Sequence, residues 1–335
     1  YGQPSTELNS TIGTGPYKVL GLDTTARLLK FTANEEYYRG APAVKNITVR
    51  FYGNSDSLVL ALLNGDIDTV FGWGAGVDYY YVPQILSNPS MRISLNPSVA
   101  MHALNFNCNR TPFNDVELRK AVSYALDYVQ LKDIIMGGYG SVPNTGIIPS
   151  SMKNYVETAQ FQTNVTKAKE MLTTLGYVDI DEDGFREMPN GSKFQPQLLL
   201  SSATRWVRSA EIIEENLKAV GIDVQLKVVS SGFAGEKAKR EYDMVLSGTS
   251  QAGTFAWESY YTVQVDGYGS LGDCQVFDAQ LQSIIDALKN STTDGQQATA
   301  AKNLQEYYAA KIPAIPLYWF SNIQPFNGRY EGFGY

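Results

Sequence analysis

The segment GYVDIDEDGFREMPNG, residues 176–191, places acidic side chains at alternate positions of a short loop. Counted from Asp179 as the first position, Gly184 stands at the sixth, which is the spacing with which an EF-hand loop arranges oxygen ligands around calcium. Carboxylate and carbonyl oxygens are the ligands that calcium prefers. The sequence therefore predicts a structural calcium ion, with ligands from Asp179, Asp181, Asp183, the Phe185 carbonyl and Glu187.

The second half of this loop departs from an EF-hand. Asn190 stands where a bidentate Glu is expected, and Pro189 followed by Asn190-Gly191 predicts a tight turn instead of a second helix. The alternative interpretation is a solvated acidic hairpin turn that binds no ion. In either case the loop has a structural role, so other residues have to carry the function.

The residues that enzymes use most often for catalysis are scarce in this chain. His102 is the only histidine, so a Ser-His-Asp or Cys-His arrangement would have to use it. Its surroundings, MHALNFN, predict a strand on which a half-buried histidine is satisfied by its neighbours. The chain has no GxSxG, HExxH or Walker motif, and no GxGxxG motif that follows a strand. The sequence therefore predicts a protein that is not an enzyme.

The composition predicts a large folded protein with two domains or lobes. The chain has 335 residues, 44% of them apolar and 18% charged, which is enough to bury a substantial core. Its net charge of −7 argues against nucleic acid and anionic membrane surfaces as partners. No apolar run is long enough to span a bilayer, so any link to a membrane would be an anchor outside this chain.

The first residue of the chain indicates a piece of a longer protein, and its glycosylation-type triplets indicate a secreted one. The chain begins at Tyr1 without Met and shows no signal peptide, so a processed or excised piece of a longer protein is expected. Asn-x-Ser/Thr triplets, for example at Asn46 and Asn290, are more frequent than chance predicts and support a secreted surface protein.

Hydrophobic patterns near the start predict a strand, a helix and another strand. The segment VKNITVRFY alternates apolar and polar residues as a strand does. A helix capped by Asn54 or Ser55 follows and ends at Gly65. IDTVFGW then predicts the second strand, and this order is typical of α/β proteins.

The same alternation continues to the end of the chain. A long helix is predicted from Asn114 or Asp115, and a second one, capped by Asn164 and ended by Gly176, comes directly before the acidic loop. The apolar residues of the long helix form one stripe: Leu118, Val122, Ala125, Leu126 and Val129. Further strands are predicted at FQPQLLLSS, IDVQLKVV, YDMVLSG and IPAIPLYWF.

Nine segments, in this order along the chain, carry a resemblance to a known family: GTGPY, ANEEYYRGAPAVKNITVRFY, ALLNGDID, LNFNCNRTPFNDVELRKAVSYALD, NTGIIPSS, AKEMLTTLGY, IIEENLKAVGIDVQL, REYDMVLSG and IPAIPLYW. Together they resemble the family 5 extracellular solute-binding proteins, which include the peptide-, nickel- and oligosaccharide-binding receptors of ABC importers.

The resemblance implies an α/β fold of the two-lobed, periplasmic-binding-protein-like type II class, in which two lobes close around a ligand. The first lobe would comprise residues 1–105 and 317–335, and the second lobe residues 106–316, so hinge strands would cross twice between them. The family normally carries a long segment ahead of GTGPY, so the first lobe is expected to be incomplete.

The resemblance also implies a function. The protein would be a non-catalytic receptor in the periplasm or anchored on the outer face of the membrane, which captures a small polar solute and delivers it to an ABC transporter permease. An oligopeptide is the expected ligand, and nickel or a metallophore is the alternative within the family. A cell-surface hydrolase acting on peptide or glycan is the alternative from another class, and a structural surface module is a third.

The positions that match the family's motifs supply the candidate ligand contacts. Peptide-binding members usually carry an Asp after the strand REYDMVLSG, but here the following segment SGTSQAGTFAWESYY has Glu258 as its only acidic residue, so dipeptide specificity is not supported. The candidate contacts are polar or aromatic side chains from both lobes: Trp73, His102, Asn105, Tyr139, Trp257 and Tyr260.

Cys108 and Cys274 both fall in the second lobe that the resemblance implies. A disulfide between them is compatible with an extracellular site, and two buried free thiols are the alternative. Two cysteines and one histidine do not suffice for a structural zinc site.

Overall fold

The computed structural model describes residues 13–71, 76–249 and 272–331, and these fall in two compact units, Tyr1–Asp68 and Thr69–Tyr335. Each unit has its own sheet. Among the described residues, no helix combines the length and the apolar character that crossing a membrane requires.

The first unit contains an antiparallel sheet of β1 (Tyr17–Asp23), β2 (Leu28–Ala33) and β3 (Asn46–Arg50), followed by α1 (Ser55–Asn64). Helix α1 begins and ends where the sequence predicts. The Asn54 side chain accepts a hydrogen bond from the Ser57 backbone N–H, and Gly65 ends the helix with a φ of 80°, a left-handed conformation that favours glycine.

The second unit is built on a five-stranded sheet in the order β6-β5-β7-β4-β8. The strands are β4 (Met91–Phe106), β5 (Gln197–Ser201), β6 (Gln225–Val229), β7 (Met244–Thr249) and β8 (Ala314–Asn327). Strand β5 is parallel to β6 and β7, whereas β4 is antiparallel to β7 and β8. The strands predicted from the sequence in this part of the chain are confirmed. The predicted strand IDTVFGW is wrong for its described residues, because only Thr69 forms an isolated bridge, with Phe326.

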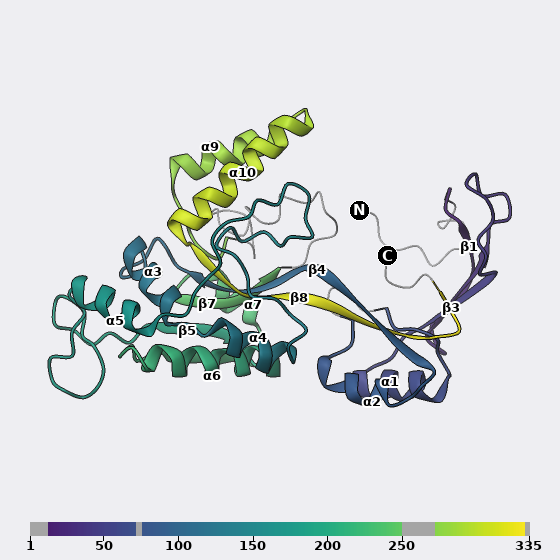
Figure 1. The fold of residues 1–335 in the computed structure, drawn as a ribbon, viewed down its shortest axis with the longest axis horizontal. Coiled ribbons are helices and arrows are strands. Elements are labelled where there is room, and N and C mark those ends of the chain that lie inside the picture. The colour runs from purple at the N-terminus through teal and green to yellow at the C-terminus, as the bar shows by residue number, and fades with distance from the viewer. Residues whose placement is uncertain (1–12, 72–75, 250–271, 332–335) are drawn as a thin grey trace. The chain divides into compact units, whose positions relative to one another are not determined.

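Helices cover both faces of this sheet (Figure 1). One face packs against α3 (Val116–Ala125), α4 (Tyr128–Met136), α5 (Val165–Thr174) and α6 (Thr204–Lys218), and the other against α9 (Ala279–Lys289) and α10 (Asp294–Lys311). Strand β4 serves both cores because successive side chains alternate between faces: Leu104 and Phe106 lie in the first core, Met101 and Ala103 in the second. The remaining elements are short: η2 (Tyr79–Tyr81), α2 (Val82–Leu86) and α7 (Phe233–Ala238).

The long helix predicted from Asn114 or Asp115 is wrong in one respect. The helix begins after Asp115, whose side chain caps it, but it ends at Leu126, which has an extended backbone. Asp127 then caps α4 by accepting a hydrogen bond from the Gln130 backbone N–H. Because the break rotates the second helix relative to the first, Val129 is 54% exposed instead of continuing the buried stripe.

Arg119 on α3 ties two helices and a loop together from inside the protein. The side chain is buried, and its guanidinium donates to the carbonyl oxygens of Lys311 and Ile312 at the end of α10 and to that of Phe113. The last carbonyls of a helix lack partners within the helix, so this guanidinium satisfies groups that would otherwise be buried without hydrogen bonds.

The β4–β8 ladder is irregular at two places: the register shifts between His102 and Ala103, and more extensively between Pro97 and Met101. Pro97 pairs with Ser321 and Met101 pairs with Trp319, so three residues of β4 stand opposite one residue of β8. Such a bulge bends a strand locally, and Pro97 has no N–H to donate to the ladder. The lobe boundaries at residues 105/106 and 316/317 fall within these two strands and stay a prediction.

Candidate functional site

The candidate site lies where the parallel strands of the second unit end. His102 on β4 pairs with Gly248, near the carboxyl end of β7, and the neighbouring strand β5 ends at Ser201, shortly before α6 begins at Thr204. In α/β sheets, ligands bind preferentially at the carboxyl ends of parallel strands. The side chain of His102 is half-buried and lies on the face of the sheet that α6 covers.

Three aromatic rings surround the imidazole of His102. The indole of Trp206, in the first turn of α6, stacks on it with ring centroids 3.7 Å apart and planes inclined by 20°. Phe320 meets it edge-on, with centroids 4.7 Å apart. A Cβ atom at Gly248 would lie 2.8 Å from His102 Cδ2 and 3.2 Å from Trp206 Cη2, so the bare backbone at this position gives the stacked pair its room.

A hydrogen bond fixes the third ring. Tyr318 Oη lies 2.7 Å from His102 Nδ1 and 3.4 Å from Ser209 Oγ, and Ser209 itself donates to the Arg205 carbonyl. Burial raises the pKa of Tyr318 to about 12, so its hydroxyl keeps its proton and is able to donate a hydrogen bond to Nδ1. We infer that His102 carries its own proton on Nε2.

His102 is neutral at ordinary pH. Burial of the ring lowers its pKa well below the usual range, and the positive charge of Arg205 lowers the pKa further. A neutral imidazole with one hydrogen-bonded nitrogen is a positioned polar group, and it has no carboxylate partner with which to act as a catalytic base in the part of the chain that the structure describes.

Arg205 gives the site a charged edge. Its guanidinium forms an ion pair with Asp78 and lies over the ring of Phe320, 5.3 Å from the ring centroid. The side chains of Arg205 and Asp78 are 30% and 31% exposed, so both remain reachable from solvent. The site thus combines an aromatic wall, one neutral imidazole and an accessible pair of opposite charges.

Asn105, also predicted as a ligand contact, faces the interior. It is 1% exposed, and its side-chain amide donates to Ser247 Oγ at 2.8 Å, while its oxygen accepts from the Cys274 thiol. Ser247 in turn donates to the buried carboxylate of Asp273, which forms an ion pair with Lys237. The polar atoms of Asn105 thus hold an internal network together, and its role as a ligand contact stays a prediction.

Of the other four predicted ligand contacts, the structure describes one. Tyr139 is half-buried in the turn after α4, where its backbone N–H donates to the Met136 carbonyl. Trp73, Trp257 and Tyr260 lie outside the described residues. Their role as ligand contacts stays a prediction.

Sequence reasoning missed Arg205 and Trp206. The available signal was their position: an arginine and a tryptophan in the first turn of a helix that directly follows the buried strand LLLSS. Side chains at that place lie at the carboxyl edge of the sheet, where α/β folds bind ligands.

The predicted disulfide is not present in the structure, where Cys108 and Cys274 are free thiols. The two residues are neighbours nonetheless, because the Cys108 backbone N–H donates to the Cys274 carbonyl at 2.8 Å. Burial raises the pKa of Cys108 to about 11 and places that of Cys274 well above its usual range, so both thiols stay protonated.

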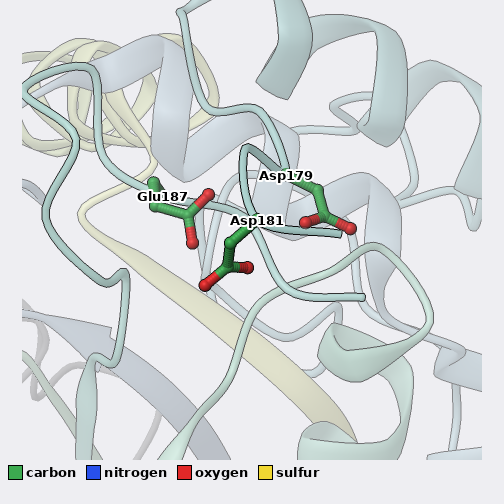
Figure 2. A group of neighbouring side chains, drawn as sticks. All are labelled: Asp179, Asp181 and Glu187. Atoms are coloured by element: carbon green, nitrogen blue, oxygen red, sulfur yellow. The ribbon is translucent and has the colours of Figure 1, made fainter. Parts of the chain in front are cut away.

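The acidic loop brings three of its predicted ligands together (Figure 2). Asp179, Asp181 and Glu187 each offer a carboxylate oxygen, and these oxygens lie within 4.8 Å of one another. Glu187 is only 6% exposed, and the Ile180 backbone N–H donates to it at 2.7 Å. Carboxylates this close repel one another, so the arrangement fits a hard cation such as calcium.

Asp183 is turned away from this group. Its carboxylate accepts a hydrogen bond from the Phe185 backbone N–H at 2.8 Å and lies 3.4 Å from Lys193 Nζ. Asp179 accepts from the Gly184 N–H, and Asp181 from the Asp183 N–H, so the loop also forms the tight turn that the alternative interpretation describes. Calcium at this loop stays a prediction.

Comparisons with known proteins agree with the fold. The profile of the bacterial extracellular solute-binding proteins, family 5 middle domain, matches residues 2–269. The oligopeptide-binding protein AppA of Bacillus subtilis is 24% identical over 97% of this chain, and the nickel-binding periplasmic protein of Escherichia coli is 27% identical over 65% of it. The structure is similar to NikA from Brucella suis in complex with Fe(III)-EDTA, with a TM-score of 0.82 and 19% identity over 96% of this chain. This likeness confirms the predicted fold class.

The matches also show that the relatives are longer. The chain spans 59% of the length of AppA, 42% of that of the nickel-binding protein and 65% of the solved NikA chain.

Proposed function

Because the chain belongs to the bacterial extracellular solute-binding proteins of family 5, we propose that it is the ligand-capturing part of a receptor that serves an ABC importer. The family consists of binding proteins and not of enzymes, and none of the relatives reported above is a hydrolase. The observation that carries the proposal is the combined match of sequence, over residues 2–269, and of fold, over 96% of the chain.

The geometry of the site supports capture of a small polar solute. His102 and Trp206 form a rigid aromatic wall, and the partly exposed Arg205 and Asp78 offer one charge of each sign. A zwitterionic ligand with apolar side chains, such as a short peptide, can place its carboxylate near the guanidinium, its amine near the carboxylate and a side chain against the rings. We therefore propose an oligopeptide as the ligand.

Nickel, free or held by a metallophore, is the second candidate. His102 is the only imidazole of the chain, and its Nδ1 is occupied by Tyr318, which leaves Nε2 as a single nitrogen ligand. One nitrogen cannot form a nickel site by itself, so the metal would have to arrive with a small chelator that supplies the other ligands.

The receptor would work outside the cell, in the periplasm or tethered to the outer face of the membrane, and would pass its ligand to the importer's permease. The family's name supports the extracellular location. The permease partner and the manner of attachment are part of the proposal.

Thermal-shift screening of the full-length protein tests this function. The probes are mixtures of di- to nonapeptides, nickel chloride, and nickel chloride with histidine. A ligand at a hundred times its Kd stabilises the protein by about 2.7 kcal/mol, which raises the melting temperature measurably. A rise with peptides supports the main proposal, a rise only with the nickel–histidine mixture supports the second candidate, and no rise with any probe contradicts both.

A variant pair ties the result to the site. Trp206→Ala should weaken peptide binding at least tenfold, because it removes the wall that stacks on His102. Phe277→Ala, at an aromatic that is 61% exposed outside the site, should leave binding unchanged.

A further inference from the structure

The larger irregularity of the β4–β8 ladder separates two parts of the second unit along these strands. The described residues 69–71, 76–97 and 321–327, called here the outer segment, lie on one side of the bulge between Pro97 and Met101, and the described residues 101–249 and 272–320, the inner body, lie on the other. The outer segment is held together by its own bonds to β8: the Val77 N–H donates to the Ile323 carbonyl at 3.0 Å, and the Thr69 hydroxyl to that of Pro325 at 3.0 Å.

Two neighbouring residues of the outer segment reach across the bulge to the inner body. Asp78 forms its ion pair with Arg205 of α6. Tyr79 donates its hydroxyl to the Ile134 carbonyl, near the end of α4, at 2.9 Å. The two contacts therefore attach the start of η2 to two different helices of the inner body.

The contact of Tyr79 also depends on shape. Gly137, which ends α4 with a φ of 56°, lies directly under the Tyr79 ring, and a Cβ atom there would come within 2.1 Å of Tyr79 Cδ2. Glycine therefore serves two purposes at this position, since it permits the left-handed backbone and leaves space for the ring.

The contact of Asp78 is joined to the candidate site through Arg205. Its guanidinium lies over Phe320, the single residue of β8 that stands opposite the three-residue bulge, and the next residue along α6 is Trp206. Releasing Asp78 would free Arg205 and leave Tyr79 as the remaining contact described here between the outer segment and the helices of the inner body.

We propose that Asp78 and Tyr79 form a clasp that holds the outer segment against the inner body without any ligand, and that its release opens the access to His102 and Trp206. Asp78 and Tyr79 fall in the first lobe that the sequence implies, and Arg205 and Ile134 in the second. The clasp therefore sets the balance between an open and a closed receptor, and its biological meaning rests on the proposed function.

Distance measurements between two spin labels on the full chain test the clasp. Leu86→Cys on α2 and Glu211→Cys on α6 place labels at exposed positions on the two sides of the bulge, while the partly buried Cys108 and the buried Cys274 have raised thiol pKa values and should stay unlabelled. Without ligand, the parent should give one narrow distance distribution. Asp78→Asn, Arg205→Gln and the double variant should each broaden it and shift it to longer distances by the same amount, because each removes the same pair.

Tyr79→Phe should produce a smaller shift in the same direction, since it removes one hydrogen bond and keeps the ring. Lys302→Gln, which breaks an exposed ion pair with Glu306 within α10, is the matched control and should leave the distribution unchanged.

Distributions that stay unchanged in the Asp78 and Arg205 variants would overturn the clasp. The clasp would also be overturned if the distance shifts of the two single variants added up in the double variant, because additive shifts would show that the two residues act separately. The measurement needs no ligand, so its failure would leave the proposed capture function standing, and a failed ligand screen would leave the clasp standing.

Discussion

The imidazole of His102 lies flat against the indole of Trp206, with ring centroids 3.7 Å apart, and its Nδ1 receives the hydroxyl of Tyr318. One face and one nitrogen of the ring are therefore closed to water. A proton added to this ring would lose hydration and would face the positive charge of Arg205. The ring is thus held neutral by the fold.

Stability should consequently fall in mild acid because of this one residue. The pKa of His102 is lowered in the folded chain. At pH values below the unfolded pKa of about 6.5, the unfolded chain therefore binds a proton at His102 that the folded chain does not bind. Above about pH 6.5 the titration of His102 takes nothing from the free energy of unfolding. As the pH falls below this value, the free energy of unfolding decreases, with a slope that approaches about 1.4 kcal/mol per pH unit. Urea unfolding at pH 7.5, 6.5 and 5.5 measures it.

The variant His102→Gln provides the comparison, since no other histidine titrates in this range. The stability difference between the parent and this variant should shrink in acid. The groups that face the ring are Arg205 and Tyr318, with Asp78 paired to Arg205, and the variant keeps all of them. A difference that is constant across the three pH values would contradict the lowered pKa.

Replacing Arg119 should be among the most destabilising single changes in the second unit. Arg119→Met keeps the length of the side chain and removes donors to three buried carbonyls, so we expect a loss of about 3 kcal/mol in the free energy of unfolding. The adjacent Lys120→Gln breaks only an exposed pair with Glu117 and should change stability by less than about 0.5 kcal/mol. Equal changes in the free energy of unfolding for the two substitutions would show that the buried guanidinium of Arg119 stabilises the fold no more than an exposed ion pair does.

The acidic loop can be tested by chelation. If calcium binds there, EDTA should lower the melting temperature by on the order of 5 °C, and added calcium should restore it. Glu187→Gln should abolish this calcium response, because Glu187 is the buried member of the group that includes Asp179 and Asp181. Asp183→Asn should keep most of it, since Asp183 faces Lys193. A melting temperature that does not change with EDTA would contradict calcium binding and support the interpretation as a hairpin turn without an ion.

Thiol titration can decide the state of Cys108 and Cys274. With a pKa of about 11, Cys108 has roughly a thousandth of its thiol ionised at pH 8, so both buried cysteines should react very slowly with Ellman's reagent in the native chain. Unfolding in guanidinium without reductant should release two reactive thiols per chain. If none appear until reductant is added, the two form a disulfide in the isolated protein.

The sequence predicted the elements whose signals are local. Asn54, Asn164 and Gly65 mark helix ends through their own side chain or backbone conformation, and the structure has them in these roles. The break after Ala125 was missed because the apolar residues continue across it at helical spacing, while Asp127, which caps the second helix, is also an ordinary helix-surface residue.

The candidate site was only half predictable. His102 was predicted because it is the only histidine, but its neighbours Trp206, Tyr318 and Arg205 come from distant parts of the chain. Arg205 in turn forms an ion pair with Asp78, from another distant segment. No local pattern encodes such contacts, since they depend on how the strands are ordered in the sheet. The burial of Asn105 was not predictable either, because a strand next to a hinge motif can point a polar side chain into the core.

The pairing of β4 with β8 has a consequence for how the protein is made. Strand β4 lies in the first third of the sequence, and its partner β8 contains nearly the last residues that the structure describes. During synthesis β4 therefore has an open sheet edge until β8 has been produced, and contacts of such long sequence separation form slowly. Because the ladder between β4 and β8 requires both strands, the sheet of the second unit can be completed only after β8 has been synthesised.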